Sequence, residues 1–269
     1  MWRASSTGWA ASCVRCSPRG GATGARLASL LRSEGLQVLT VEAQADTRET
    51  LCVTETARGG CLRFVLPGEP LREREWHDAL VRACGAAEEC KWLVAGGSLP
   101  PGVPQDFYAR LTALARQHEG RVVLDAPIEP AALALRGGGL HIVKAGVDLL
   151  RDVTGEPLET DDALLGAARS LIRSGACEIL AITRGAEEAM LVTRQEVLRA
   201  APVTIRATGC IGAGSSFVAG LVQSLAGGRD LRGAFATAMA AGAAALLAPP
   251  GALADAATIE KLREQVWIR

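Results

Sequence analysis

The chain has 269 residues, of which 29 are basic, 29 are acidic and 49% are hydrophobic. This length allows one large domain or two small ones, with a core that needs no disulfide staples. Balanced charge supplies no basic field of the kind that attracts nucleic acid or anionic lipid, so we expect neither as a partner.

The sequence also argues against a membrane protein and against a disulfide-rich one. No apolar run reaches the roughly 20 residues that a membrane helix needs. The 8 cysteines are dispersed, which is typical of reduced thiols in a cytoplasmic protein. Cys13 and Cys16 form a CxxC pair, but the 3 histidines are scattered, so we expect no metal site there.

The first 19 residues differ in composition from the remainder. They contain several serines and arginines, and no acidic residue occurs before Glu34. This composition is compatible with a transit-like extension and equally with a truncated or misassigned start. We therefore treat residues 1–19 as an atypical segment and residues 20–269 as a single domain.

Strand and helix signals alternate along most of the chain. A β-type run at 37–42 is followed by two more, which flank a polar stretch and predict a hairpin at about 50–66. From residue 91 onward, short apolar strands alternate with amphipathic helices. The expected strands are 92–95, 121–125, 141–144 and 178–182; the helices include 105–117 and 161–173; a second hairpin follows at 189–193 and 197–200. This alternation predicts an α/β fold with a mainly parallel sheet covered by helices on both faces.

The most informative segment runs from Thr208 to Gly220 and contains Gly212, Ala213, Gly214 and Ser215. Its glycines permit close backbone approach and lead into a helix whose first amides have no internal partner, a geometry that binds anions such as phosphate. The segment is neither a Walker loop nor a dinucleotide fingerprint. From these residues alone, an anion site and a plain loop-to-helix turn are equally good interpretations.

Several motifs in order carry a family resemblance. They are Asp46-Thr-Arg48, the segment Gly97-Ser-Leu-Pro-Pro-Gly-Val-Pro104, Lys144 after a strand, Thr183-Arg-Gly185-Ala186, and Gly212-Ala-Gly214. With these motifs the chain, from about residue 20 to its end, resembles the PfkB carbohydrate kinases. The nearest branch is the one that contains 1-phosphofructokinase and tagatose-6-phosphate kinase.

The resemblance implies a fold and an activity. The fold would be a ribokinase-like three-layer α/β sandwich, with the hairpin at about 50–66 as a small β lid that closes over the sugar and often helps to form a dimer. The activity would be transfer of the γ-phosphate of ATP to a hydroxyl of a phosphorylated ketohexose, such as fructose 1-phosphate or tagatose 6-phosphate. ATP and Mg would be the cofactors, and a sugar phosphate the small-molecule partner.

The resemblance also implies roles for individual residues. Arg48 would grip the sugar phosphate through its planar fork, next to Gly97 and Ser98 on the substrate side. On the nucleotide side the implied residues are Lys144, Thr183, Gly185 and Gly242. Asp125 ends a strand, and we interpret it mainly as a structural residue. Glu188 stands where the family has glycine, which suggests that it crowds or repels ATP.

The chain departs from the family at its catalytic residues. Ser215 occupies the position of the aspartate that takes the proton from the sugar hydroxyl, and no acidic residue occurs between Arg206 and Arg229. A hydroxyl is a far weaker base than a carboxylate, and loss of a positioned base costs about 10²–10⁴ in rate. We therefore expect the turn at 212–215 to fold normally and to catalyse poorly.

Two further departures point the same way. The family's Asn and Glu that organise magnesium correspond to Gly146 and Leu149, and Asp148 lies one place early, so we predict no metal ligands in the chain. The family's earlier Gly-Gly-Lys-Gly-x-Asn motif, which contacts the sugar, is absent. Two interpretations remain: a sugar-phosphate kinase homologue with severely reduced activity, and a non-catalytic pseudokinase that binds nucleotide or sugar phosphate as a regulator or dimer partner.

Overall fold

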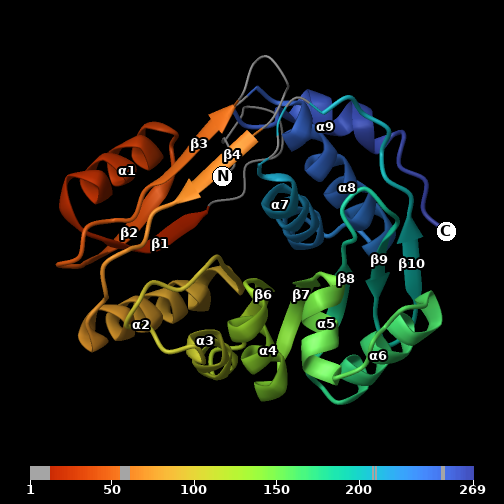
Figure 1. Ribbon diagram of the computed structural model, residues 1–269, viewed down its shortest axis with the longest axis horizontal. Helices are drawn as coiled ribbons and strands as arrows, with labels where there is room; N and C mark the ends of the chain where they lie inside the picture. Colours follow the sequence, from red (N-terminus) through yellow and green to blue (C-terminus); the bar gives the residue numbers. More distant parts are fainter. Residues whose placement is uncertain (1–12, 55–60, 208, 210, 250–251) are drawn as a thin grey trace.

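The computed structural model describes residues 13–54, 61–207, 209, 211–249 and 252–269. Its main body is a six-stranded sheet between two layers of helices (Figure 1). In spatial order the strands are β10 (Val197–Ala200), β9 (Ala189–Val192), β8 (Cys177–Ile182), β7 (Leu140–Ala145), β6 (Arg121–Asp125) and β5 (Trp92–Gly96). The four strands β5 to β8 run parallel, and β9 and β10 add an antiparallel edge. The predicted α/β fold with a mainly parallel sheet is confirmed.

Helices cover both faces of this sheet. One face carries α3 (Phe107–Arg116), α4 (Ile128–Gly137), α5 (Val147–Thr154) and α6 (Asp161–Arg173); the other carries α7 (Ala213–Ala226), α8 (Leu231–Leu247) and α9 (Ala256–Arg263). Successive strand residues point to opposite faces. Val122 and Leu124 accordingly join the core under α3 and α4, whereas Val123 lies with Phe217 and Phe235 under α7 and α8. The sheet is therefore buried on both faces, as a parallel sheet requires.

A second, smaller sheet lies at the N-terminal side of the molecule. Strand β1 (Val14–Arg19) pairs in parallel with β2 (Gln37–Glu42), and α1 (Gly21–Ser33) connects them. Helix α2 (Glu73–Cys90) packs against both β1 and β5 and so joins the two sheets. No strand was predicted at residues 14–19, because Arg, Ser and Pro interrupt the short apolar pattern there, yet the structure has β1 at this place.

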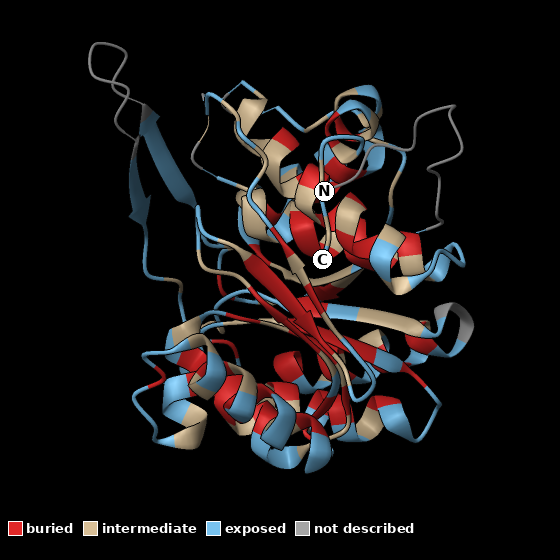
Figure 2. Cartoon of the chain, turned by 90° about the vertical axis from the view of Figure 1, so that its right-hand side faces the viewer, coloured by how far each residue is buried: buried red, intermediate tan, exposed pale blue. Residues whose placement is uncertain are grey.

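The predicted hairpin at 50–66 forms β3 (Thr50–Thr54) and β4 (Cys61–Val65), which pair only with each other. Leu51 lies opposite Phe64 and Val53 opposite Leu62. These four side chains share one face of the hairpin and are between 43% and 61% exposed. Figure 2 shows the hairpin as a pale blue arm that projects from the body. It therefore presents an apolar face that the described part of this chain does not cover.

Within the described residues, no helix combines the length and the apolar character that crossing a bilayer demands.

Candidate functional site

The predicted site residues gather where the parallel strands end. Ser98 follows β5 and Asp125 ends β6. Lys144 is the second-last residue of β7, and Thr183 follows β8. The backbone N–H of Thr183 donates to the carbonyl of Ala145 (3.0 Å), which keeps the β7 and β8 ends together. Open α/β sheets bind their ligands at this edge.

The glycine-rich turn forms the start of helix α7. Gly212 is the N-cap residue with φ of 95°, a left-handed conformation that favours glycine, and it has no side chain to cap the helix. The first intrahelical bond runs from the amide of Ser216 to the carbonyl of Gly212 (2.8 Å). No acceptor within the described residues binds the amides of residues 213–215. This turn, residues 212–215, is called the cradle below, because its open amides favour an anion.

An ion pair lies directly against the cradle. Lys144 Nζ donates to Asp125 Oδ1 at 3.0 Å, and both side chains are largely buried, with 18% and 28% of their surface exposed. A Cβ atom on Gly214 would lie 3.2 Å from Lys144 Nζ and 4.0 Å from Asp125 Oδ2. A side chain at position 214 would therefore crowd the ammonium group of Lys144. The structure thus brings Lys144 and Asp125 together beside Gly214 of the cradle.

The substrate side of the site begins at Arg48. Its Nη2 donates to Ser98 Oγ at 2.7 Å, so the loop before β3 meets the loop after β5. The neighbouring residue Gly97 donates its amide to the carbonyl of Asp125 (3.0 Å) and accepts at its own carbonyl from the Tyr108 hydroxyl (2.8 Å). A set of contacts therefore runs from Arg48 through the loop at 97–98 to the backbone of Asp125, whose carboxylate lies beside the cradle.

Tyr108 is the buried support of this loop. Burial, reinforced by the charge of Asp125, raises the pKa of its hydroxyl to about 12, so it remains a donor at every physiological pH. Sequence reasoning missed Tyr108 because nothing in a lone tyrosine on a helix marks it as a loop anchor.

The loop that carries Arg48 is fixed by its neighbours. Gly20 donates its amide to Thr47 Oγ1 (3.1 Å), and Thr47 returns its own amide to the carbonyl of Gly20 (3.1 Å). On the other side, Glu75 of α2 accepts from the amide of Gln44 (2.9 Å) and from that of Arg72 (2.9 Å). Arg48 is therefore placed by the β1–α1 turn and by the start of α2.

The loop after β8, with Thr183 and Gly185, belongs to an ion-pair network. Arg184 binds Asp161 (2.9 Å), Arg199 binds both Asp161 and Glu188, and Arg269 at the C-terminal end binds Glu188 (2.7 Å). Glu188, expected to crowd or repel ATP, has its carboxylate between two guanidinium groups. Its effect on nucleotide binding remains a prediction.

Gly242 is placed by helix packing. It lies in α8 where a Cβ atom would be 3.2 Å from the carbonyl of Ala213 and 3.6 Å from the Cβ of Phe217. Glycine at 242 therefore lets α8 approach the first turn of α7. This contact puts Gly242 behind the cradle and supports its geometry.

The positions that correspond to the family's magnesium-organising residues lie at the start of α5. Leu149 is buried, and Asp148 turns outward to Arg151 at 2.9 Å with 76% of its side chain exposed. In the part of the chain that the structure describes, no three carboxylate, histidine or cysteine side chains cluster as metal ligands.

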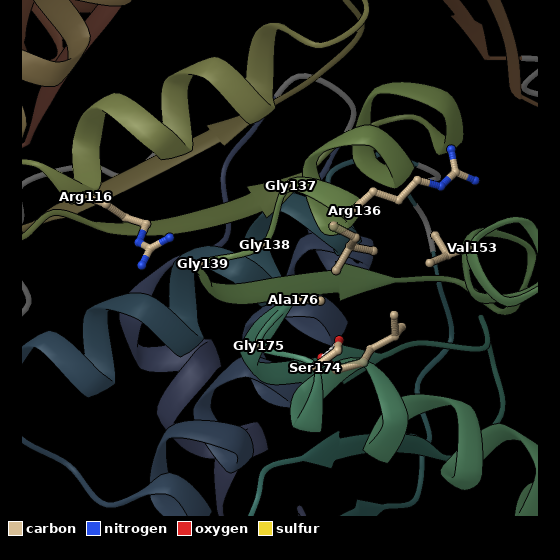
Figure 3. Close-up of a pocket in the computed structure, with 11 residues that line it drawn as sticks. Arg116, Arg136, Gly137, Gly138, Gly139, Val153, Ser174, Gly175 and Ala176 are labelled. Atoms are coloured by element: carbon tan, nitrogen blue, oxygen red, sulfur yellow. Dashed lines mark hydrogen bonds between the residues drawn. The ribbon is translucent and has the colours of Figure 1, made fainter.

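A cavity of about 460 Å³ lies at the other end of the parallel strands, where β7 and β8 begin (Figure 3). It is bordered by the loops that precede β7 and β8, including Gly138 and Gly175. The guanidinium groups of Arg116 and Arg136 lie on different sides of it, and Arg136 pairs with Asp152 (3.3 Å). None of the predicted site residues lines this cavity, so it is separate from the candidate site.

Comparison with known proteins identifies the family of the chain. Residues 8–254 match the pfkB family of carbohydrate kinases. The chain is 34% identical over 247 residues to ATP-dependent 6-phosphofructokinase isozyme 2 from Mycobacterium tuberculosis, covering 92% of this chain and 72% of the relative. It is 31% identical over 200 residues to 1-phosphofructokinase from Xanthomonas campestris, covering 73% and 63% respectively.

The chain also superposes on solved structures of carbohydrate kinases. The crystal structure of phosphofructokinase-2 from Escherichia coli in complex with potassium superposes with a TM-score of 0.88 at 31% identity, covering 94% of this chain and 82% of that one. Arabidopsis thaliana ribokinase, with ribose and ATP, superposes with a TM-score of 0.69 at 14% identity over 93% of this chain and 81% of that one, which shows the fold alone. The chain has the ribokinase-like fold and belongs to the pfkB family of carbohydrate kinases.

Proposed function

We propose that this protein is an ATP-dependent sugar-phosphate kinase in which phosphoryl transfer is slow. The observation that supports the proposal is the position of Lys144, whose ammonium group lies beside Gly214 in the cradle. Helix amides and a buried cation together stabilise negative charge on a phosphoryl group in transit. The relatives named phosphofructokinase supply the substrate class, a phosphorylated ketohexose.

The two ends of the site fit the two substrates. On the substrate side, the guanidinium group of Arg48 and the hydroxyl of Ser98 lie together, and both are suited to bind the phosphate of the sugar. The loop with Thr183 and Gly185, beside the Lys144 strand end, would take the nucleotide. Magnesium would arrive with ATP, because the described residues do not form a ligand set of their own.

The transfer is slow because of Ser215. This residue lies in the first turn of α7 with an exposed side chain, at the position of the family's general base. A serine hydroxyl does not accept a proton at neutral pH, and absence of the base lowers the rate by about 10²–10⁴. The fold and the phosphate-binding groups remain, so substrates bind although transfer is weak.

A turnover assay tests this function. ATP-dependent phosphorylation of fructose 1-phosphate, fructose 6-phosphate and tagatose 6-phosphate would be followed by detection of ADP, for the natural protein and for Arg48→Ala. We expect slow turnover of one of these sugars, and Arg48→Ala should lower it at subsaturating sugar phosphate. Binding of ATP with no turnover of any of the three would favour the non-catalytic regulator instead. Absence of both binding and turnover would contradict both functions.

We also propose that the protein forms a homodimer through the hairpin β3–β4. Leu51, Val53, Leu62 and Phe64 give this arm an apolar face that is about half exposed. Exposed apolar area of this kind is costly in water and is typical of an interface. A second copy presents the same face, so the two hairpins would cover each other about a twofold axis.

We place this activity in the cytoplasm. The five cysteines whose side chains the structure describes are Cys13, Cys16, Cys52, Cys84 and Cys177, and all are free. Free thiols persist in the reducing conditions of that compartment.

A further inference from the structure

The cradle has a carboxylate beside it that the local sequence does not contain. Asp125 belongs to β6, far along the chain from the cradle, yet its Oδ2 lies 4.0 Å from the position of a Cβ on Gly214. The stretch between Arg206 and Arg229 has no acidic residue of its own. The fold therefore supplies from a neighbouring strand what the turn at 212–215 lacks.

The two oxygens of Asp125 have different surroundings. Oδ1 accepts from Lys144 Nζ at 3.0 Å, whereas Oδ2 has no hydrogen-bond partner among residues 13–54, 61–207, 209, 211–249 and 252–269. With 28% of its surface exposed, the side chain is open to a bound molecule. An oriented carboxylate with one oxygen held and one oxygen available is suited to accept a proton.

The contacts of Asp125 also connect it to the substrate side. Its carbonyl accepts from the amide of Gly97 (3.0 Å), next to Ser98, which accepts from Arg48. The loop at 97–98, on the proposed substrate side, is therefore attached to the end of the strand that carries Asp125.

We propose that Asp125 is the catalytic base of the residual phosphoryl transfer, replacing the acceptor that Ser215 cannot provide. This inference rests on the proposed kinase function. As the sugar hydroxyl oxygen forms its bond to the γ-phosphorus, the bond between that phosphorus and the β,γ-bridging oxygen breaks and ADP leaves with the electron pair. The hydroxyl proton passes to Asp125 Oδ2. Lys144, held on Oδ1, stays beside the cradle and balances the charge of the phosphoryl group.

Four proteins test the proposal: the natural protein, Asp125→Asn, Ser215→Asp and the double variant. Asparagine keeps the size of the side chain and an oxygen for Lys144, but it accepts no proton. We expect Asp125→Asn to lower kcat by about 10²-fold or more and to change the dissociation constant of MgATP, measured by calorimetry, by less than about threefold. Asp148→Asn is the matched control, because that carboxylate pairs with Arg151 on the surface, and its kcat should equal that of the natural protein.

The double variant distinguishes a base from a structural partner of Lys144. If Asp125 is the base, Ser215→Asp supplies another acceptor, and adding Asp125→Asn to it should cost less than about tenfold in kcat. An equal loss in both backgrounds would overturn the proposal, because it would show that Asp125 acts through structure. Natural turnover that survives Asp125→Asn would overturn it while leaving the kinase function standing. No turnover in the natural protein or in Ser215→Asp would defeat the proposal and the kinase function together.

Discussion

Arg48 and Ser98 lie 50 positions apart in the chain and are joined by a hydrogen bond of 2.7 Å. This contact connects the β2–β3 loop to the end of β5 and defines the side of the site where a sugar phosphate would bind. A guanidinium fork with an adjacent hydroxyl matches the geometry of a phosphate group. The contact is also open to a direct test.

Arg48→Ala should raise the KM for the sugar phosphate by about 10–100-fold, because a charged hydrogen bond to phosphate is worth about 1.5–3 kcal/mol. The KM for ATP should stay within about twofold, since Arg48 lies away from the Thr183 loop. Arg74→Ala is a suitable control, because the Arg74 side chain is 92% exposed. Steady-state kinetics with each substrate varied in turn would measure both constants. An equal rise in both KM values would contradict the assignment.

Glu75 should give the fold a pH-dependent stability. Amide donation from Gln44, followed by that from Arg72, holds the pKa of this buried carboxyl below its usual range. A carboxyl whose folded pKa is lowered stabilises the fold above its unfolded pKa, about 4.3, and this contribution is lost as pH falls through the folded pKa. Glu75→Gln should therefore cost about 2 kcal/mol at pH 7 and progressively less below about pH 4.

Urea unfolding of the natural protein and of Glu75→Gln at several pH values would measure this difference. Glu73→Gln is the matched control, because Glu73 lies in the same turn of α2 with an exposed side chain. A constant gap between the natural protein and Glu75→Gln from pH 7 to pH 3 would show that the carboxylate charge is not the source of the stability.

The strand ends could be predicted from the sequence, whereas their mutual contacts could not. Apolar runs at 121–125 and 141–144 predicted β6 and β7, so Asp125 and Lys144 were correctly placed at strand ends. Their pairing depends on β6 and β7 being neighbours, which the order of strands in the chain does not determine. Asp125 was therefore interpreted as structural, although its carboxylate lies beside Lys144 and the cradle.

Features that a few adjacent residues encode were easier to predict than features that depend on pairing between strands. The left-handed Gly212 and the helix that follows it were predictable, because the turn and its helix are encoded within a few residues. Strand β1 was not, because Arg15, Ser17 and Pro18 obscure a strand that is stabilised by pairing with β2 and by contact with α2. Tertiary contacts override weak local signals in such segments.

The ion-pair network around Arg199 should contribute unequally to stability. Arg199 is 21% exposed and binds both Asp161 and Glu188, whereas Arg269 is 58% exposed and binds Glu188 alone. Arg199→Ala should therefore destabilise by about 1–2 kcal/mol, because Asp161 and Glu188 each lose one of their two guanidinium donors. Arg269→Ala should cost less than about 1 kcal/mol, as is typical of an exposed pair. Chemical unfolding would measure both values, and similar losses would contradict this ranking.

The apolar face of the hairpin should control self-association. Phe64→Asp places a charge on the face shared with Leu51 and should convert the dimer to a monomer. Val65→Asp introduces the same charge at 51% exposure on the opposite face, and it should leave the dimer intact. Sedimentation velocity at micromolar concentration would measure the oligomeric state. A dimer that survives Phe64→Asp, or a natural protein that is monomeric, would rule out this interface.

The most direct test of slow phosphoryl transfer is the rate of a single turnover with the natural protein and with Ser215→Asp. Both proteins would be mixed with saturating MgATP and fructose 6-phosphate, and sugar bisphosphate would be measured over time. Restoring a carboxylate on the cradle should raise the rate constant by about 10²-fold or more, because a positioned base is worth that much. A variant no faster than the natural protein would contradict the conclusion that Ser215 limits transfer.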